Sequence, residues 1–118
     1  MITGQLINVA TRHTVVRNVQ RTTTAWERFA GLMGRAAMAA DDALLIDPCA
    51  SVHTFFMRFP IDLVYLNHEF TVVKTVESMS PWRVSAAFGA RTTLELASGR
   101  IRALEISVGQ RLAWLEDE

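Results

Sequence analysis

Three side chains in the middle of the chain, His53, Asp62 and Glu95, are the candidates for acid–base chemistry. A histidine and two carboxylates can exchange protons with a substrate near neutral pH, which a hydrolase requires. Paired carboxylates are also the groups that cleave glycosidic bonds. A hydrolase that uses Asp62 and Glu95 together with His53 is therefore one hypothesis for the function.

Each of these three residues also has a structural interpretation. Asp62 lies in an apolar run, residues 60–66, where period-two alternation places it on one face with aliphatic side chains. A buried carboxylate there needs an arginine or backbone amides as partners, because an unpaired buried charge is costly. Glu95 is expected to be solvated or paired within a sheet. A histidine such as His53 is more often a hydrogen-bonded structural residue than a catalyst.

The cysteine and histidine positions do not predict a metal site. Cys49 is the only cysteine, so the chain can form no internal disulfide. Cys49 and His53 are four residues apart, but at roughly 3.3 Å per residue an extended segment separates their Cα atoms by about 13 Å. His13 and His68 lie in unrelated segments. We therefore expect no metal and no cofactor.

Trp82 and Arg83 follow a proline in residues 78–90, which have weak periodicity and which we expect to form a long loop. An exposed indole beside an arginine suits contact with a peptide, a sugar or an aromatic ligand. Arg58, together with Trp82 and Arg83, completes the predicted ligand-binding set. The alternative is that Trp82 folds back as a lid over the core.

The elements that must position these residues are mainly strands. Short segments rich in apolar and β-branched residues predict strands at residues 6–9, 13–17, 43–46, 51–57, 61–66, 70–76, 92–96 and 111–115. Alternation along 51–57 would place large apolar groups on both faces of that strand, so we expect both faces to be covered. Seven or eight such strands indicate a compact sandwich or a partly closed barrel.

Helical signals are confined to two places. Thr24 and Glu27 have the spacing of a capping box, which predicts a helix over residues 25–33. Residues 100–104 are expected to form a single helical turn after the turn at 97–99. The chain should therefore be mainly β with one α-helix near residues 25–33.

Composition limits the class of protein. The 118 residues suit one globular domain over 1–118, and 12 Lys+Arg against 12 Asp+Glu give no net charge. Without a broad positive field, nucleic-acid binding is disfavoured. The apolar runs, such as residues 36–40, are far shorter than the roughly 20 residues of a membrane span. No secretory signal is recognisable at the first residues, so we expect a cytoplasmic protein.

Three blocks resemble a known family in order and spacing. They are RFAGLMGR at 28–35, HTFFMRFPIDL at 53–63 and LELASG at 94–99, and the chain is similar in them to the domain of unknown function 192. The resemblance implies a small, mainly β, sandwich-like domain with no established activity and no cofactor. The chain departs from the family pattern at 43–46, at 56–57 and at 109–110, where relatives commonly have Gly-Asp and this chain has Gly-Gln.

The sequence thus predicts a non-enzymatic binding module for a small molecule or a protein partner. The binding residues would lie around Trp82 and at a cleft edge near His53 and Asp62. The alternatives are the hydrolase and an accessory protein that forms homo-oligomers through exposed sheet edges. Convergence of the three polar side chains would favour the enzyme, whereas an exposed apolar patch without such convergence would favour a partner site.

Overall fold

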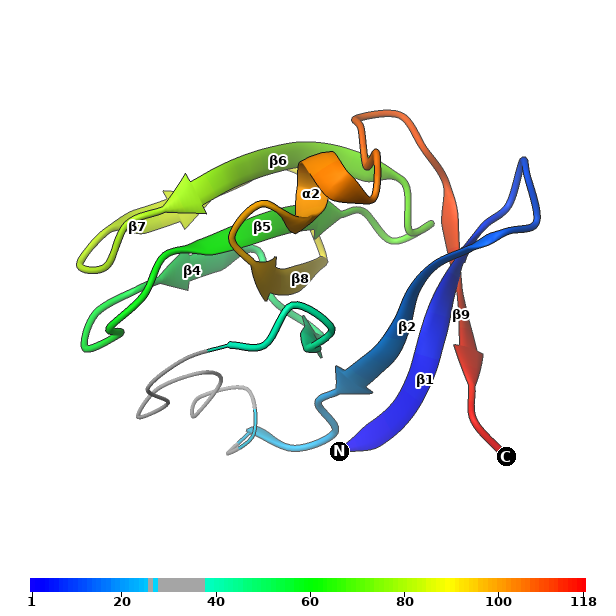
Figure 1. Ribbon diagram of the computed structural model, residues 1–118, viewed down its shortest axis with the longest axis horizontal. Helices are drawn as coiled ribbons and strands as arrows, with labels where there is room; N and C mark the ends of the chain where they lie inside the picture. The colour runs from blue at the N-terminus through cyan, green and yellow to red at the C-terminus, as the bar shows by residue number, and fades with distance from the viewer. Residues whose placement is uncertain (26, 28–37) are drawn as a thin grey trace.

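The computed structural model describes residues 1–25, 27 and 38–118, and within them the protein is mainly β (Figure 1). The strands are β1 (Ile2–Asn8), β2 (Thr14–Arg21), β3 (Ala43–Ile46), β4 (Ser51–His53), β5 (Ile61–Leu66), β6 (Val72–Met79), β7 (Val84–Ala86), β8 (Thr92–Ala97) and β9 (Leu112–Glu116). One short helix, α2 (Arg100–Ala103), lies between β8 and β9. The fold class therefore agrees with the prediction.

Seven strands form one curled sheet in the order β6-β5-β8-β3-β2-β1-β9, and β4 pairs with β7 in a second, small sheet. The large sheet is mixed, because β2 and β3 are parallel whereas its other neighbours are antiparallel. Its edge strands approach each other at one end, where Thr71 and Arg111 form an isolated bridge. The Val72 N–H also donates to the Gln110 carbonyl at 2.8 Å. The sheet is thus a half-barrel, as the prediction of a partly closed barrel requires.

Apolar clusters cover both faces of the large sheet. One cluster is completed by Ile101 of α2, and the other by Val52 of the small sheet. The central strands β3, β5 and β8 are buried along almost their whole length, so their alternating side chains contribute to both clusters. This continuous burial explains why these strands appear in the sequence as unbroken apolar runs.

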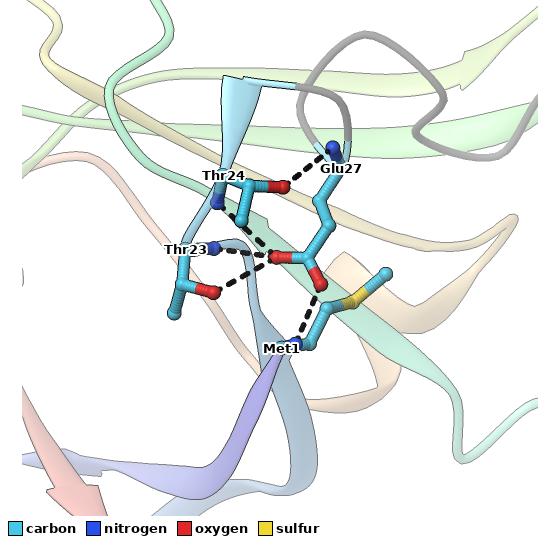
Figure 2. Close-up of polar contacts among 4 residues, drawn as sticks. All are labelled: Met1, Thr23, Thr24 and Glu27. Atoms are coloured by element: carbon cyan, nitrogen blue, oxygen red, sulfur yellow. Dashed lines mark hydrogen bonds and ion pairs between the residues drawn. The ribbon is translucent and has the colours of Figure 1, made fainter.

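The capping box predicted at Thr24 is present (Figure 2). The Thr24 hydroxyl accepts from the Glu27 N–H at 3.1 Å, and the Glu27 carboxylate accepts from the N–H groups of Thr24 at 3.2 Å and Thr23 at 2.7 Å. The Met1 ammonium lies 2.6 Å from the same carboxylate and, with the Thr23 bond, lowers the pKa of Glu27 to about 2. Residues 26 and 28–37, which hold most of the predicted helix, lie outside the described residues.

Three predicted strands have other bounds than expected, because β1 begins before residue 6, β2 continues past residue 17 and β6 continues past residue 76. Two further segments are wrong in their extent. The strand expected over 51–57 ends at His53, because the chain turns at residues 55–56 and Phe56 has a φ of 66°. The alternation argument therefore fails after His53, and the outer side of this segment is exposed rather than covered. The loop expected over 78–90 contains strand β7. Pairing with β4 makes this strand, and its three residues are too few to show a period in the sequence.

Candidate binding surface

Asp62 is a fully buried carboxylate that holds the end of β6 and the start of α2 against β5. It accepts from the backbone N–H groups of Ser78 at 2.8 Å, Gly99 at 3.1 Å and Ile101 at 2.9 Å. Ser78 lies at a register shift between β5 and β6, and Gly99 is the N-cap of α2 without a side-chain cap of its own. The carboxylate therefore satisfies amides that a bulge and a helix terminus would otherwise leave unpaired.

Glu95 lies on the opposite face of the large sheet. It is directly across from Leu63 in the β5–β8 pairing, whereas Asp62 is across from Leu96, and successive strand residues point to opposite faces. Glu95 is buried near Tyr65. Burial raises the pKa of Tyr65, with smaller contributions from the charges of Cys49 and Glu95, and the phenol donates to the Ser85 hydroxyl at 2.9 Å.

The three acid–base candidates therefore do not meet. Asp62 faces α2 and Glu95 faces the small sheet, as the register between β5 and β8 requires. His53 is exposed at the end of β4, next to the buried Val52. Both carboxylates lie in central strands, but the residue opposite Asp62 is Leu96, the neighbour of Glu95. Because neighbouring residues of a strand point to opposite faces, this register separates the two carboxylates.

Four exposed rings instead gather where the β4–β5 and β6–β7 loops meet. We call His53, Phe55, Phe56 and Trp82 the aromatic surface. The ring centroids are 5.1 Å apart for His53 and Phe55, 5.8 Å for Phe55 and Trp82, and 4.8 Å for Phe56 and Trp82. Phe56 is 66% and Trp82 55% exposed. The indole therefore packs on other surface rings and is not a lid buried against the core.

Thr54 ties the two loops of the aromatic surface together. Its hydroxyl donates to the Ser80 carbonyl at 2.7 Å and accepts from the Arg83 N–H at 2.9 Å. Its backbone N–H donates to the Arg83 carbonyl, and its carbonyl accepts from the Trp82 N–H, both at 2.9 Å. Thr54 is fully buried. Sequence reasoning missed this residue; a single threonine inside an apolar run is the only local sign of it.

Two bulky residues of this surface have left-handed backbone. The φ angles are 66° at Phe56 and 63° at Trp82. This region is uncommon for bulky side chains, and it persists only where neighbouring contacts fix the chain. The Thr54 bonds provide those contacts, so the backbone that carries these rings is fixed within the fold.

The predicted arginines flank the aromatic surface in the chain. Arg83 directly follows Trp82, and its guanidinium donates to the Trp82 carbonyl at 3.4 Å. Arg58 is exposed two residues after Phe56. Both loops lie at the same end of the molecule, on the left in Figure 1 and away from β1, β2 and β9. The structure thus places Trp82 and Arg83, and the loop that carries Arg58, at one end of the fold.

Other parts of the described chain show no comparable arrangement for chemistry. Within residues 1–25, 27 and 38–118, no group of three or more His, Cys, Asp or Glu could hold a metal ion. In the same residues no helix is long and apolar enough to cross a membrane. The Cys49 thiol donates to the Ser51 carbonyl at 3.0 Å. A depression of about 330 Å³ between β2 and α2 is lined by both charge signs, including Arg17, Arg100 and Asp42, and by none of the predicted site residues.

Known proteins resemble this chain in sequence. Residues 7–114 match the model of DUF192, described as an uncharacterized ACR. A UPF0127 protein of Pyrococcus abyssi is 34% identical over 67 residues, which are 56% of each chain. A UPF0127 protein of Pyrococcus furiosus is 41% identical over 66 residues, which are 55% of this chain and 56% of that protein. The matched part thus spans about half the length of these curated relatives.

Two solved structures share the fold. One is a protein of unknown function from Novosphingobium aromaticivorans, with a TM-score of 0.76 and 21% identity over 95% of this chain and 84% of that chain. The other, from Sinorhizobium meliloti, is described as a proposed transcription regulator; its TM-score is 0.79 and its identity 24%, over 96% of this chain and 92% of that chain. At these identities the likeness shows the fold alone.

Proposed function

The chain belongs to the DUF192 family, and we propose that it is a non-enzymatic binding module whose aromatic surface docks a protein partner. One observation carries this proposal: Phe55, Phe56 and Trp82 are exposed, pack on one another and are held by buried bonds from Thr54. Exposed aromatic clusters of this kind are typical of interaction sites.

The energetics of protein interfaces support this interpretation. Tryptophan and arginine are enriched among the few residues that dominate binding, and truncation of such a residue costs about 2–4 kcal/mol of binding free energy. Trp82 and Arg83 are adjacent in the chain. Because the Thr54 bonds already fix the loops, little conformational entropy is lost when a partner binds. The surface therefore has the composition and the rigidity of a docking site.

The alternative functions find less support. A hydrolase that uses Asp62 and Glu95 together needs both carboxylates in one pocket, but they lie on opposite faces of the large sheet. Homo-oligomer formation would use a sheet edge, and the feature in its favour is Leu115 of β9, which is 50% exposed. Regulation of transcription, as described for the Sinorhizobium meliloti protein, is compatible with a module that acts through a protein contact.

The proposal is tested by site-specific photo-crosslinking in the native host cells. A benzophenone amino acid replaces Phe55 of the aromatic surface or Val84, which is 67% exposed and lies opposite His53 in the β4–β7 pairing. Val108, which is 62% exposed elsewhere, is the control position. We expect one protein to be crosslinked from Phe55 and Val84 but not from Val108, and we expect the purified partner to bind Trp82→Asn at least about tenfold more weakly.

The other outcomes contradict the proposal in different ways. A conjugate with twice the mass of the chain indicates a second copy and supports the oligomerising alternative. Equal crosslinking from Val108, or an identified partner that binds Trp82→Asn with unchanged affinity, would show that the aromatic surface is not the docking site.

A further inference from the structure

The segments that build the aromatic surface carry positive charge only. Residues 48–61 contain Arg58, residues 78–91 contain Arg83 and Arg91, and neither segment contains Asp or Glu. The whole chain has 12 basic and 12 acidic residues. The acids that balance these cations therefore lie outside the two segments. Glu95, which faces the small sheet, is buried, so the exposed charges that the segments themselves carry are positive only.

The acidic residues that border these segments are engaged with other groups. Asp47 forms an ion pair with Arg21, and Asp62 is buried among backbone amides. Glu77 lies 3.5 Å from Arg102 of α2, which packs on the other face of the large sheet. The charges of Arg58 and Arg83 are thus not neutralised by the acids that are their nearest neighbours in the sequence.

The apolar part of the surface continues along β7 and into the turn that follows it. Val84 is 67% exposed and Phe88 105% exposed, and the intervening Ala86 is exposed as well. Within β7 the exposed Val84 and Ala86 are about 7 Å apart at roughly 3.3 Å per residue, and Phe88 extends the strip beyond the strand. With the aromatic surface beside it, this strip is long enough to contact several successive side chains of a partner segment.

We propose that the partner docks through a segment that combines apolar side chains with aspartate or glutamate, an inference that rests on the proposed function. The apolar side chains would pack on Trp82 and its neighbouring rings, and the carboxylates would pair with Arg58 and Arg83. Guanidinium groups bind carboxylates through two parallel hydrogen bonds, which gives orientation as well as attraction. Such charge complementarity mainly sets specificity and the association rate.

Two other occupants fit the surface less well. A second copy bound by two-fold symmetry would bring the same patch against itself, so the arginines of both copies would meet. Aromatic and basic residues also occur at membrane surfaces, where binding depends on burial of apolar side chains among lipids. Here the rings pack on one another and their loops are fixed by Thr54. A fixed arrangement of side chains suits a protein partner of complementary shape better than a lipid bilayer.

Selection from a random peptide library by ribosome display tests this proposal. The bait is the full chain, and the counter-bait is Phe56→Asn/Trp82→Asn, because asparagine tolerates the left-handed φ that both positions require. We expect the enriched peptides to contain apolar residues and more Asp and Glu than the starting library. Failure to enrich any peptide over the counter-bait would overturn both this proposal and the proposed function.

Enrichment of neutral or basic peptides would overturn only the proposed acidic chemistry and would leave the docking function intact. The most enriched peptide is then synthesised and its affinity measured for Arg58→Glu/Arg83→Glu and for Arg12→Glu/Arg111→Glu. The control changes two exposed arginines outside these segments by the same total charge. We expect about tenfold weaker binding for the first variant only, and weaker binding of the wild type in high salt.

Equal loss for both charge variants would contradict a role for Arg58 and Arg83. Vesicles of phosphatidylcholine with about one phosphatidylserine in four are the lipid probe. Vesicle binding that is lost in Phe56→Asn/Trp82→Asn, combined with no enriched peptide, would assign the surface to a membrane and overturn the protein partner.

Discussion

Asp62 and Thr54 perform similar structural tasks on opposite sides of β5, with different consequences. Both are fully buried polar residues that bond backbone groups at least 16 residues away in the chain. The Asp62 bonds hold the start of α2 against the large sheet, where Ile101 and other apolar groups cover the core. The Thr54 bonds hold two loops whose large side chains remain exposed. A buried anchor can therefore complete the core in one region and present a surface in another.

The largest expected effect is loss of the Asp62 anchor. In Asp62→Ala three backbone amides lose a charged acceptor inside the protein. Because buried donors left without an acceptor are costly, we expect unfolding free energy to fall by about 3–5 kcal/mol, measured by urea denaturation. Asp62→Asn keeps one oxygen acceptor and should be less destabilised. An equal, small loss in both variants would contradict the anchoring role.

The second effect separates the two anchors. Thr54→Val keeps the shape of the side chain but removes the hydroxyl that bonds Ser80 and Arg83. We expect a loss of about 1–3 kcal/mol in unfolding free energy and weaker partner binding, because the loops are no longer tied together. Thr54→Ser, which keeps the hydroxyl, should restore binding. Unchanged binding by the valine variant would show that the rings do not need this anchor.

The third effect should appear in binding and not in stability. Phe56→Asn and Trp82→Asn replace exposed side chains at left-handed positions, so we expect unfolding free energy to change by no more than about 0.5 kcal/mol. Thermal unfolding of each variant beside Val108→Asn measures this. A large destabilisation by Trp82→Asn would mean that the indole supports the fold. The aromatic surface would then have a structural role, as the Asp62 side has.

The smallest effect concerns Glu27, which belongs to neither anchor. Its pKa is lowered from 4.5 to about 2, because the Met1 ammonium and the Thr23 amide stabilise the charged form. A lowered folded-state pKa contributes stability above the unfolded-state pKa, and that contribution disappears as the pH falls from 4.5 toward 2. The difference in melting temperature between wild type and Glu27→Gln should therefore shrink over this range. A constant difference would contradict the assignment.

Much of the fold could be predicted from local patterns. Strands β3 and β5 have the predicted bounds, and α2 is the predicted helical turn. The Thr24 capping box is also as predicted, since its partners are three residues apart. These elements depend on apolar runs, turn residues and short-range hydrogen bonds, which are visible in the order of residues.

The candidate surface could be predicted only in part. The sequence drew attention to Trp82 and Arg83, but the strand assigned to 51–57 hid the exposure of Phe55 and Phe56. That error arose because the chain leaves its extended path at Thr54, whose partners are more than twenty residues away. The periodic pattern of one segment contains no information about its hydrogen bonds to another segment.

The sequence by itself determined the mainly β class and the existence of the strands that became β3 and β5, because alternation and apolar runs act within a few residues. The family followed from the resemblance of three motif blocks and not from periodicity. The sequence also predicted that Asp62 and Glu95 lie in two separate strands, which the structure shows to be the central strands β5 and β8. Tertiary structure alone decided that these carboxylates face opposite ways and that rings from two loops share one surface. The physical reason is that register between strands and bonds between loops are made by residues distant in the chain, so only the folded arrangement fixes them.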